Sequence, residues 1–218
     1  MPLCKVKLLL PNLGNFLVKT LAVYFMNNLF PIFLKLDQLQ TLIIGGGYVG
    51  LEKITAVLEN SPEANITLIA PEIKEEIINF SKNNNNLKLI HRKFEDDDLE
   101  GKDLVIVATN DKTENARIKS VSKQKKILTN VADTPNLCDF YLSSVVRKGD
   151  LKMAISTNGK SPTVAKRIKE VLQESFPEEI DQTLNNLTKI RETLTGDFAS
   201  KVVKLNEITQ LLINPQKK

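Results

Sequence analysis

Short runs of apolar residues alternate along the chain with stretches in which apolar residues recur at helical spacing. Five such runs predict strands, at residues 41–44, 65–69, 87–91, 103–108 and 127–130. Between them the pattern predicts helices over Tyr48–Asn60, from Pro71 through Phe80 and over Lys112–Lys123. Because strands separated by helices of this length form βαβ units, the sequence predicts a parallel sheet.

A different pattern begins after Pro135. Phe140–Arg147 and Leu151–Ser156 are predicted to be strands, and Lys148-Gly149-Asp150 between them is a hairpin signal. A helix is expected from Pro162 to about Glu174, and the residues that follow are charged and helical in pattern. We therefore expect an α/β fold with a Rossmann-type parallel sheet, a hairpin-plus-helix unit and a helical tail.

The first 26 residues match none of these elements. The apolar run from Phe16 to Phe25 is interrupted by Lys19, lacks a signal-peptide cleavage site and is shorter than the about 20 apolar residues of a membrane span. A membrane-associating amphipathic segment is the alternative, but the basic polar face of such segments is missing. We expect a segment outside the fold, so a chain that begins at Met26 should be soluble, dimeric and fully active.

Composition narrows the classes of function. The 30 basic and 26 acidic residues leave a net charge of +4, too small and too scattered to indicate nucleic-acid binding. Cys4 and Cys138 stand outside any CxxC or Cys/His cluster, so we expect no metal site, and a cytoplasmic protein with free thiols. The only histidine, His91, excludes a mechanism that needs two, and the acidic run at 96–98 is expected to be a solvated loop.

Residues 45–50 read Gly-Gly-Gly-Tyr-Val-Gly and contain a G-x-G-x-x-G pattern between a predicted strand and a predicted helix. Gly45 permits a tight turn, Gly47 lets a pyrophosphate approach the backbone, and Gly50 lets the helix pack closely on the sheet. The free amides and the dipole at the helix start favour phosphate groups. A glycine turn without a ligand is the alternative, but the strand-to-helix context favours a dinucleotide.

An acidic residue at the end of the second strand is expected to meet the cofactor ribose. Glu72, which lies 22 positions after Gly50, is the nearest candidate, and a solvated glutamate in a first helical turn is the alternative. No arginine stands there to bind a 2′-phosphate, although Lys74 is close. The sequence therefore predicts NAD rather than NADP.

Several motifs, in this order, resemble the precorrin-2 dehydrogenase family, which includes the N-terminal part of bacterial siroheme synthase. They lie at residues 29–36, 45–50, 107–111, 130–133 with 137–140, and 154–162, and the resemblance extends from Asn28 to Phe176. It implies oxidation of precorrin-2, a tetrapyrrole, to sirohydrochlorin in siroheme biosynthesis, with NAD as hydride acceptor. In some members the same site inserts ferrous iron. The resemblance also implies a homodimer built through Phe140 to about Glu170.

The resemblance assigns roles to particular residues. Asp133 of the Asn-Val-x-Asp motif is the candidate catalytic group, and a carboxylate there can accept a proton while a hydride leaves the adjoining carbon; simple capping of a turn is the alternative. The expected cofactor contacts are Gly45, Gly47, Tyr48, Val49, Gly50, Pro71, Glu72, Thr109 and Asn110.

A polar turn before the helix at Pro162 is the candidate site for the substrate carboxylates. Its residues are Ser156, Thr157, Asn158, Gly159 and Lys160. An ordinary helix start with a solvated basic face is the alternative. Thr157 stands where some relatives carry a regulatory serine.

Four regions are expected: an extra segment at 1–26, an NAD-binding Rossmann domain at 27–139, a dimerisation and substrate unit at 140–176, and a helical region at 177–218. An NAD-binding regulatory module without catalysis is the main alternative function. Such a module would not be expected to carry the Asn-Val-x-Asp segment followed by the hairpin. A chelatase that only inserts metal is a third possibility, and chelation that survives loss of the glycine loop would support it. No membrane or nucleic-acid partner is expected.

Overall fold

The computed structural model describes residues 27 and 29–213, with side chains described as far as Gln210. The chain divides into two units, residues 1–32 and 33–218, and all the elements below belong to the second. The segment 1–26, with the expected start at Met26, lies outside the described residues.

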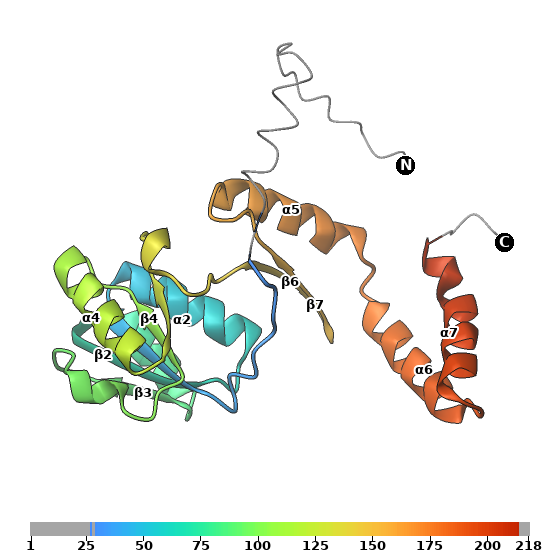
Figure 1. Cartoon of the computed structure of the whole chain (residues 1–218), viewed down its shortest axis with the longest axis horizontal. Helices are drawn as coiled ribbons and strands as arrows, with labels where there is room; N and C mark the ends of the chain where they lie inside the picture. Colours follow the sequence, from blue (N-terminus) through green and yellow to red (C-terminus); the bar gives the residue numbers. More distant parts are fainter. Residues whose placement is uncertain (1–26, 28, 214–218) are drawn as a thin grey trace, which may run out of the picture. The chain divides into compact units, whose positions relative to one another are not determined.

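Parallel strands form the central sheet (Figure 1). Their order is β3-β2-β1-β4-β5. These strands are β1 (Gln40–Gly46), β2 (Asn65–Ile73), β3 (Leu87–Ile90), β4 (Leu104–Val107) and β5 (Leu128–Val131). Every residue of β4 is buried, as expected for a central strand covered on both faces. The strand order reverses between β1 and β4, and open parallel sheets bind ligands at such a point, outside the carboxyl ends of the strands. The predicted Rossmann-type sheet is confirmed.

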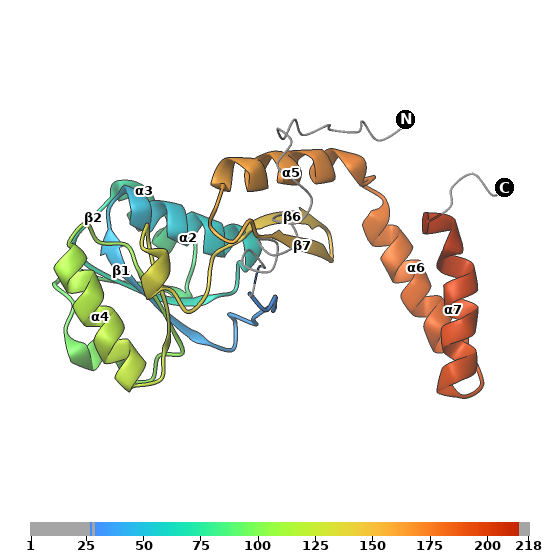
Figure 2. The same ribbon diagram turned by 45° about the horizontal axis from the view of Figure 1, so that its top comes forward.

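Helices cover both faces of this sheet (Figure 2). The helices α2 (Tyr48–Asn60) and α3 (Glu75–Lys82) pack on one face through Ile54 and Ile77, and α4 (Lys112–Gln124) packs on the other through Ile118. All three isoleucine side chains are completely buried. Truncating any one of them to alanine would leave a cavity and lower the free energy of unfolding by about 2–5 kcal/mol.

The helix expected to start at Pro71 starts later. Pro71 and Glu72 belong to β2, which continues to Ile73, and α3 begins at Glu75. The register between β1 and β2 shifts here: Ile44 pairs with Ile69, whereas Gly46, two residues later, pairs with Ile73. Such a bulge tolerates a proline, which has no amide hydrogen to donate to the ladder. A long-range strand pairing therefore overrides the local preference of proline for a first helical turn.

The predicted hairpin is present as β6 (Ser144–Lys148) and β7 (Leu151–Ile155), which pair antiparallel. The sequence predicted that the first of these strands begins at Phe140, but it begins at Ser144. The reason is that Phe140 and Leu142 pack against the hydrophobic core beneath α2. In addition, the Phe140 carbonyl accepts a hydrogen bond from the Asn130 side chain at 2.8 Å.

Basic side chains of the hairpin bind the C-terminal end of α2. Arg147 Nη1 donates to the Glu59 carbonyl at 3.0 Å, and Lys152 Nζ donates to the Asn60 carbonyl at 2.6 Å. Carbonyl groups in the last turn of a helix lack intrahelical partners, and the helix dipole favours cations there. The two contacts therefore hold the hairpin against the sheet domain.

Three helices follow, α5 (Pro162–Ser175), α6 (Ile180–Thr193) and α7 (Phe198–Ile213), so the helical tail is also confirmed. The start of α6 is fastened to the hairpin turn: the Asp150 amide donates to Asp181 Oδ1 at 2.7 Å, and Lys148 forms an ion pair with Glu178. A Cβ at Gly149 would lie 2.2 Å from Asp181 Oδ1, so this contact requires glycine in the turn.

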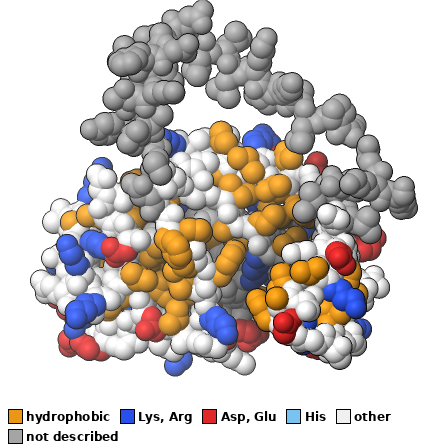
Figure 3. Space-filling model, turned by 45° about the vertical axis from the view of Figure 1, so that its right-hand side comes forward, with side chains coloured by type: hydrophobic (Ala, Val, Ile, Leu, Met, Phe, Trp, Pro, Cys, Tyr) orange, Lys and Arg blue, Asp and Glu red, His pale blue; other side chains and the backbone are white. Residues whose placement is uncertain are grey.

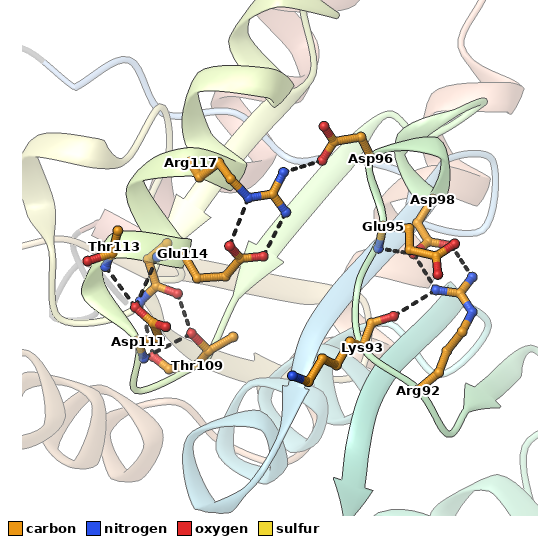
Figure 4. Close-up of polar contacts among 11 residues, drawn as sticks. Arg92, Lys93, Glu95, Asp96, Asp98, Thr109, Asp111, Thr113, Glu114 and Arg117 are labelled. Carbon is orange, nitrogen blue, oxygen red and sulfur yellow. Dashed lines mark hydrogen bonds and ion pairs between the residues drawn. The ribbon is translucent and has the colours of Figure 1, made fainter.

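The acidic run forms the short 3-10 helix η2 (Asp96–Leu99), and arginines pair with its carboxylates (Figure 4). Arg92 binds Asp98, and this hydrogen bond holds the pKa of the Asp98 carboxyl below its ordinary value. Arg117 bridges Asp96 and Glu114, and both carboxylates raise the pKa of its guanidinium. The run is therefore an ion-paired 3-10 helix rather than the solvated loop that the sequence predicted.

The described residues contain neither a metal-ligand cluster nor a candidate membrane span. There, no group of three or more His, Cys, Asp and Glu side chains is arranged to hold a metal ion. None of the helices in that part of the chain is long and apolar enough to cross a membrane.

Candidate functional site

The glycine loop joins β1 to α2 at the carboxyl end of the sheet. Gly45 has a φ of +117°, and a Cβ on it would lie 2.4 Å from the Ala108 carbonyl oxygen. Gly50 is buried, and a Cβ there would lie 2.1 Å from the Gly45 carbonyl oxygen. These two glycines therefore allow the loop, the end of β4 and the first turn of α2 to approach closely.

Gly47 has a different environment. It is exposed and precedes α2 with a φ of −82°, and a Cβ built on it meets nothing within 4 Å. The space above it opens over the first turn of α2, where amides lack intrahelical acceptors and the dipole favours an anion. A dinucleotide pyrophosphate fits this arrangement, because its phosphates could contact the backbone directly.

The end of β2 lies beside the loop. The Lys74 amide donates to the Gly46 carbonyl at 3.0 Å, and a Cβ on Gly46 would lie 2.4 Å from the Glu72 carbonyl oxygen. The Lys74 ammonium lies 3.9 Å from the centre of the Tyr48 ring and 3.4 Å from Glu76 Oε1. Glu72 is exposed next to this cluster. The remaining expected contacts here, Val49 and Pro71, are half-buried and exposed, respectively.

The turn after β4 borders the loop on its other side, since a Cβ on Gly45 would lie 3.2 Å from the Thr109 amide nitrogen. The half-buried Thr109 hydroxyl donates to Asn115 Oδ1, and Asn115 Nδ2 donates back to the Thr109 carbonyl at 3.0 Å. Asp111 caps α4 by accepting hydrogen bonds from two amides (Figure 4). Asn110, between Thr109 and Asp111, is exposed. Sequence reasoning missed Asn115, whose only signal is a polar residue at a buried helical position.

Asp133 lies in a tight turn directly after β5. The Thr134 amide donates to the Val131 carbonyl at 3.3 Å, and the Ala132 amide donates to the Val107 carbonyl at 2.9 Å. Asp133 itself is exposed and has a φ of +54°, which is uncommon for a residue with a side chain. Within the part of the chain that the structure describes, its carboxylate has no hydrogen-bonding or ion-pair partner. A capping role for this carboxylate therefore has no support, and the group is available to a ligand.

Residues 156–160 form a turn between β7 and α5, so they follow a strand of the separate two-stranded sheet. Asn158 and Gly159 have positive φ values of 56° and 72°. The Thr157 hydroxyl accepts a hydrogen bond from the Ser161 amide at 3.2 Å and donates to the Ser161 carbonyl at 3.1 Å. The Asn158 amide donates to Ser156 Oγ at 3.1 Å. These bonds stay within the turn and stiffen it, and the first turn of α5 begins beside it.

The structure therefore brings most of the expected residues together at the carboxyl end of the sheet. The glycine loop, the end of β2, the Thr109 turn and the Asp133 turn all follow the carboxyl ends of parallel strands. The turn at 156–160 belongs to another element. Sequence reasoning gave no role to Asn130, Cys138 and Asp139, although they lie inside quoted motifs. In the structure Asn130 belongs to β5, and Cys138 and Asp139 form hydrogen bonds with that strand.

Two protein families match adjacent parts of the chain, and the boundary between the two matches falls within β6. Residues 32–144 match the family described as "Putative NAD(P)-binding". Residues 148–175 match the family described as "Sirohaem biosynthesis protein central".

Individual relatives agree with these families. The chain is 35% identical over 172 residues to a siroheme synthase of Pseudoalteromonas translucida, covering 79% of this chain and 34% of the relative. It is 34% identical over 178 residues to that of Psychrobacter cryohalolentis, covering 82% of this chain and 33% of the relative. The chain thus spans about a third of the length of these relatives. Among solved structures, "SirC, precorrin-2 dehydrogenase" matches with a TM-score of 0.62 and 30% identity, covering 83% of this chain and 89% of that one.

Proposed function

Because the chain belongs to the family of NAD(P)-binding sirohaem-biosynthesis proteins that includes the precorrin-2 dehydrogenase SirC, we propose that it oxidises precorrin-2 to sirohydrochlorin. The membership bears out the resemblance seen in the sequence. The observation that carries the proposal is that an open glycine loop and an exposed carboxylate with no partner among the described residues lie together at the carboxyl end of the sheet. A loop of this kind suits the cofactor, and the carboxylate suits proton transfer.

The residues divide the work between binding and proton transfer. Bound NAD would supply the hydride acceptor. The backbone at Gly45, Gly47 and Gly50 and the amides at Tyr48 and Val49 would hold its pyrophosphate, and the Thr109-Asn110 turn would flank it. Asp133 would accept the proton that leaves the substrate as the hydride departs from the neighbouring carbon.

We propose that NAD is preferred over NADP. Glu72 is exposed next to the glycine loop, and Pro71 and Glu72 lie near the carboxyl end of β2, the strand that reaches the ribose in such folds. A carboxylate accepts hydrogen bonds from ribose hydroxyls and repels a 2′-phosphate. The Lys74 ammonium is held between the Tyr48 ring and Glu76, which lessens its availability to a phosphate.

The proposed reaction is tested by anaerobic incubation of the full chain with precorrin-2 and NAD. NADH absorbance should appear only when both are present, and NADP should be the poorer acceptor. A regulatory module would instead bind NAD in a titration without forming NADH, which would refute the dehydrogenase proposal. Ferrous iron added afterwards tests whether the same site also inserts the metal, a second activity that would require Asp133 as well.

We propose further that residues 27–139 act as the cofactor domain, 140–176 as the dimerisation and substrate unit, and 177–218 as an appended helical region. The turn at 156–160 would contact carboxylates of the tetrapyrrole through the Ser156 hydroxyl, the backbone amides of Thr157 and Gly159, the Asn158 side-chain amide and the Lys160 ammonium. A helix start offers free amides and a favourable dipole for such groups. The segment before residue 27 remains outside this proposal.

The proposed homodimer has a physical rationale in α5. Hydrophobic side chains gather in patches on the face shown in Figure 3. On α5, Val164, Ile168 and Val171 are 49%, 41% and 62% exposed, and their spacing places them on one side of the helix. A two-stranded sheet with a single helix has little core of its own, so a second copy covering this stripe would stabilise it.

Ile168→Glu should therefore weaken the dimer about a hundredfold or more, because an unpaired charge buried in an interface costs about 3–5 kcal/mol. Light scattering over a dilution series measures the change. Thr163→Glu is the matched control, since it adds the same charge at an exposed position outside the stripe. A dimer equally stable in both variants would place the interface elsewhere.

A further inference from the structure

The strand before the Asp133 turn has a free edge. β5 is the last strand of the sheet, so the outward amides and carbonyls of Thr129 and Val131 have no neighbouring strand. Backbone groups of this kind need other partners, and exposed sheet edges are usually covered. Here the chain leaves β5, passes through Asp133 and returns so that residues 138–140 lie along the same edge.

Asp139 occupies the first of the outward positions. The Thr129 amide donates to Asp139 Oδ2 at 2.9 Å, and the Asp139 amide donates to the Thr129 carbonyl at 2.7 Å. The same carboxylate forms an ion pair with Lys119 of α4. The side chain of Asp139 thus takes the place that a backbone carbonyl of a further strand would occupy.

Cys138 binds the next outward position. The Val131 amide donates to Cys138 Sγ at 3.3 Å, and Sγ lies 3.2 Å from the Val131 carbonyl oxygen and 3.4 Å from that of Thr134. The single S–H can therefore donate at either end of the Asp133 turn. Burial raises the pKa of the Cys138 thiol, which keeps the S–H needed for this bond.

Asn130 lies between Thr129 and Val131 in β5 and binds the same returning segment. Its side chain is on a residue only 6% exposed, and Nδ2 donates to the Phe140 carbonyl at 2.8 Å and lies 3.6 Å from Cys138 Sγ. Three consecutive residues of β5 are thus joined to three consecutive residues after the loop. We call Asn130, Cys138 and Asp139 the clasp.

We propose that the clasp positions the Asp133 carboxylate for proton transfer. It fixes both ends of the loop at 132–137, and so holds Asp133 in a conformation with positive φ that the residue would otherwise leave. Strained backbone persists only where the surrounding structure determines it. A reacting group displaced by about 1 Å can lose about a hundredfold in rate. The proposal rests on the proposed role of Asp133, and it makes the clasp residues positioning residues that do not touch the substrate.

Asp139→Ala and Cys138→Ala test the clasp in the full chain. Each should lower kcat for precorrin-2 oxidation about tenfold or more. The dissociation constant for NAD should stay within about twofold, because the glycine loop follows β1, two strands away. Hydrogen exchange of the Thr134 amide, which bonds to the Val131 carbonyl, should become faster.

Conservative variants separate positioning from packing. Asp139→Asn keeps an oxygen that can accept from Thr129, and Cys138→Ser keeps a hydroxyl that can donate, so both should retain most of the kcat. Cys138→Val keeps apolar volume but no hydrogen bond, and should lose activity as the alanine variant does. Val121→Ala is the packing control: Val121 lies on α4 against the same hydrophobic core as Cys138, so its loss should lower the melting temperature and leave kcat unchanged.

The outcomes separate this proposal from the proposed function. Wild-type kcat in Asp139→Ala and Cys138→Ala, with an inactive Asp133→Asn, would overturn the clasp and leave the dehydrogenase proposal intact. A fully active Asp133→Asn would overturn the role of Asp133 itself. If the alanine variants fail to fold, the comparison of Cys138→Ser with Cys138→Val decides, and equal kcat in these two would overturn the clasp.

Discussion

Gly47→Val is expected to raise the dissociation constant for NAD about a hundredfold or more, with little change in melting temperature. The φ of −82° at this position suits any residue, and a Cβ meets no protein atom within 4 Å. The added side chain therefore strains nothing in the free protein, but it occupies the space through which the pyrophosphate approaches the first turn of α2. Calorimetric titration with NAD and a thermal melt measure the two quantities; a hundredfold change corresponds to about 2.7 kcal/mol.

Gly50→Ala provides the contrast to this variant. Its Cβ would lie 2.1 Å from the Gly45 carbonyl oxygen, so the backbone of the loop or of α2 would have to move. We expect a lower melting temperature together with weaker NAD binding. NAD affinity that is unchanged in a folded Gly47→Val protein would show that the loop does not hold the pyrophosphate.

Asp133→Gly should abolish most turnover without destabilising the protein. Glycine adopts the φ of +54° at this position without the steric cost that side chains incur there, which is about 1–2 kcal/mol for most residues and less for aspartate. The substitution removes the carboxylate proposed to accept the proton. The experiment compares NADH formation from precorrin-2 with thermal stability and NAD affinity, both of which should remain near the wild-type values.

Two variants control this result. Asp133→Asn keeps the size of the side chain and its tolerance of positive φ but cannot accept the proton, so it should be as inactive as the glycine variant. Lys126→Gly changes another exposed residue with positive φ, 60°, which follows α4. This change should have a similarly small effect on stability and leave turnover intact. Near-normal turnover in Asp133→Gly would remove Asp133 from the mechanism.

Much of this protein follows from local pattern. Apolar runs separated by helical periodicity were enough to predict the parallel sheet, the hairpin after it and the helical tail. The reason is that a strand covered on both faces needs a continuous apolar run, whereas a helix that buries one face needs apolar residues at helical spacing. The glycine pattern was equally local. The clashes that a side chain would make at Gly45 and Gly50 explain why glycine stands there, and they arise wherever a strand turns directly into a helix packed on the same sheet.

Other features depend on partners far away in the chain. The helix α3 starts after Pro71, at Glu75, because β2 continues to pair with Gly46 of β1. The local pattern favoured a helix because it contains no information about strand pairing. The first strand of the hairpin begins at Ser144 instead of Phe140, because Phe140 and Leu142 pack against the core beneath α2. Both errors lie at element boundaries, where tertiary contacts compete with local propensity.

By itself, the sequence determined the order of strands and helices along the chain and the place of the dinucleotide loop, since these depend on periodicity and on short spacings. The candidate carboxylate at Asp133 came from the resemblance to a known family. Only the tertiary structure decided that Gly47 opens onto free space, that Asp133 has a positive φ and no protein partner among the described residues, and that Asn130, Cys138 and Asp139 fasten its loop to an edge strand. The physical reason is that an outward amide of β5 becomes visible as an unpaired group only once the strand order places β5 at the edge of the sheet.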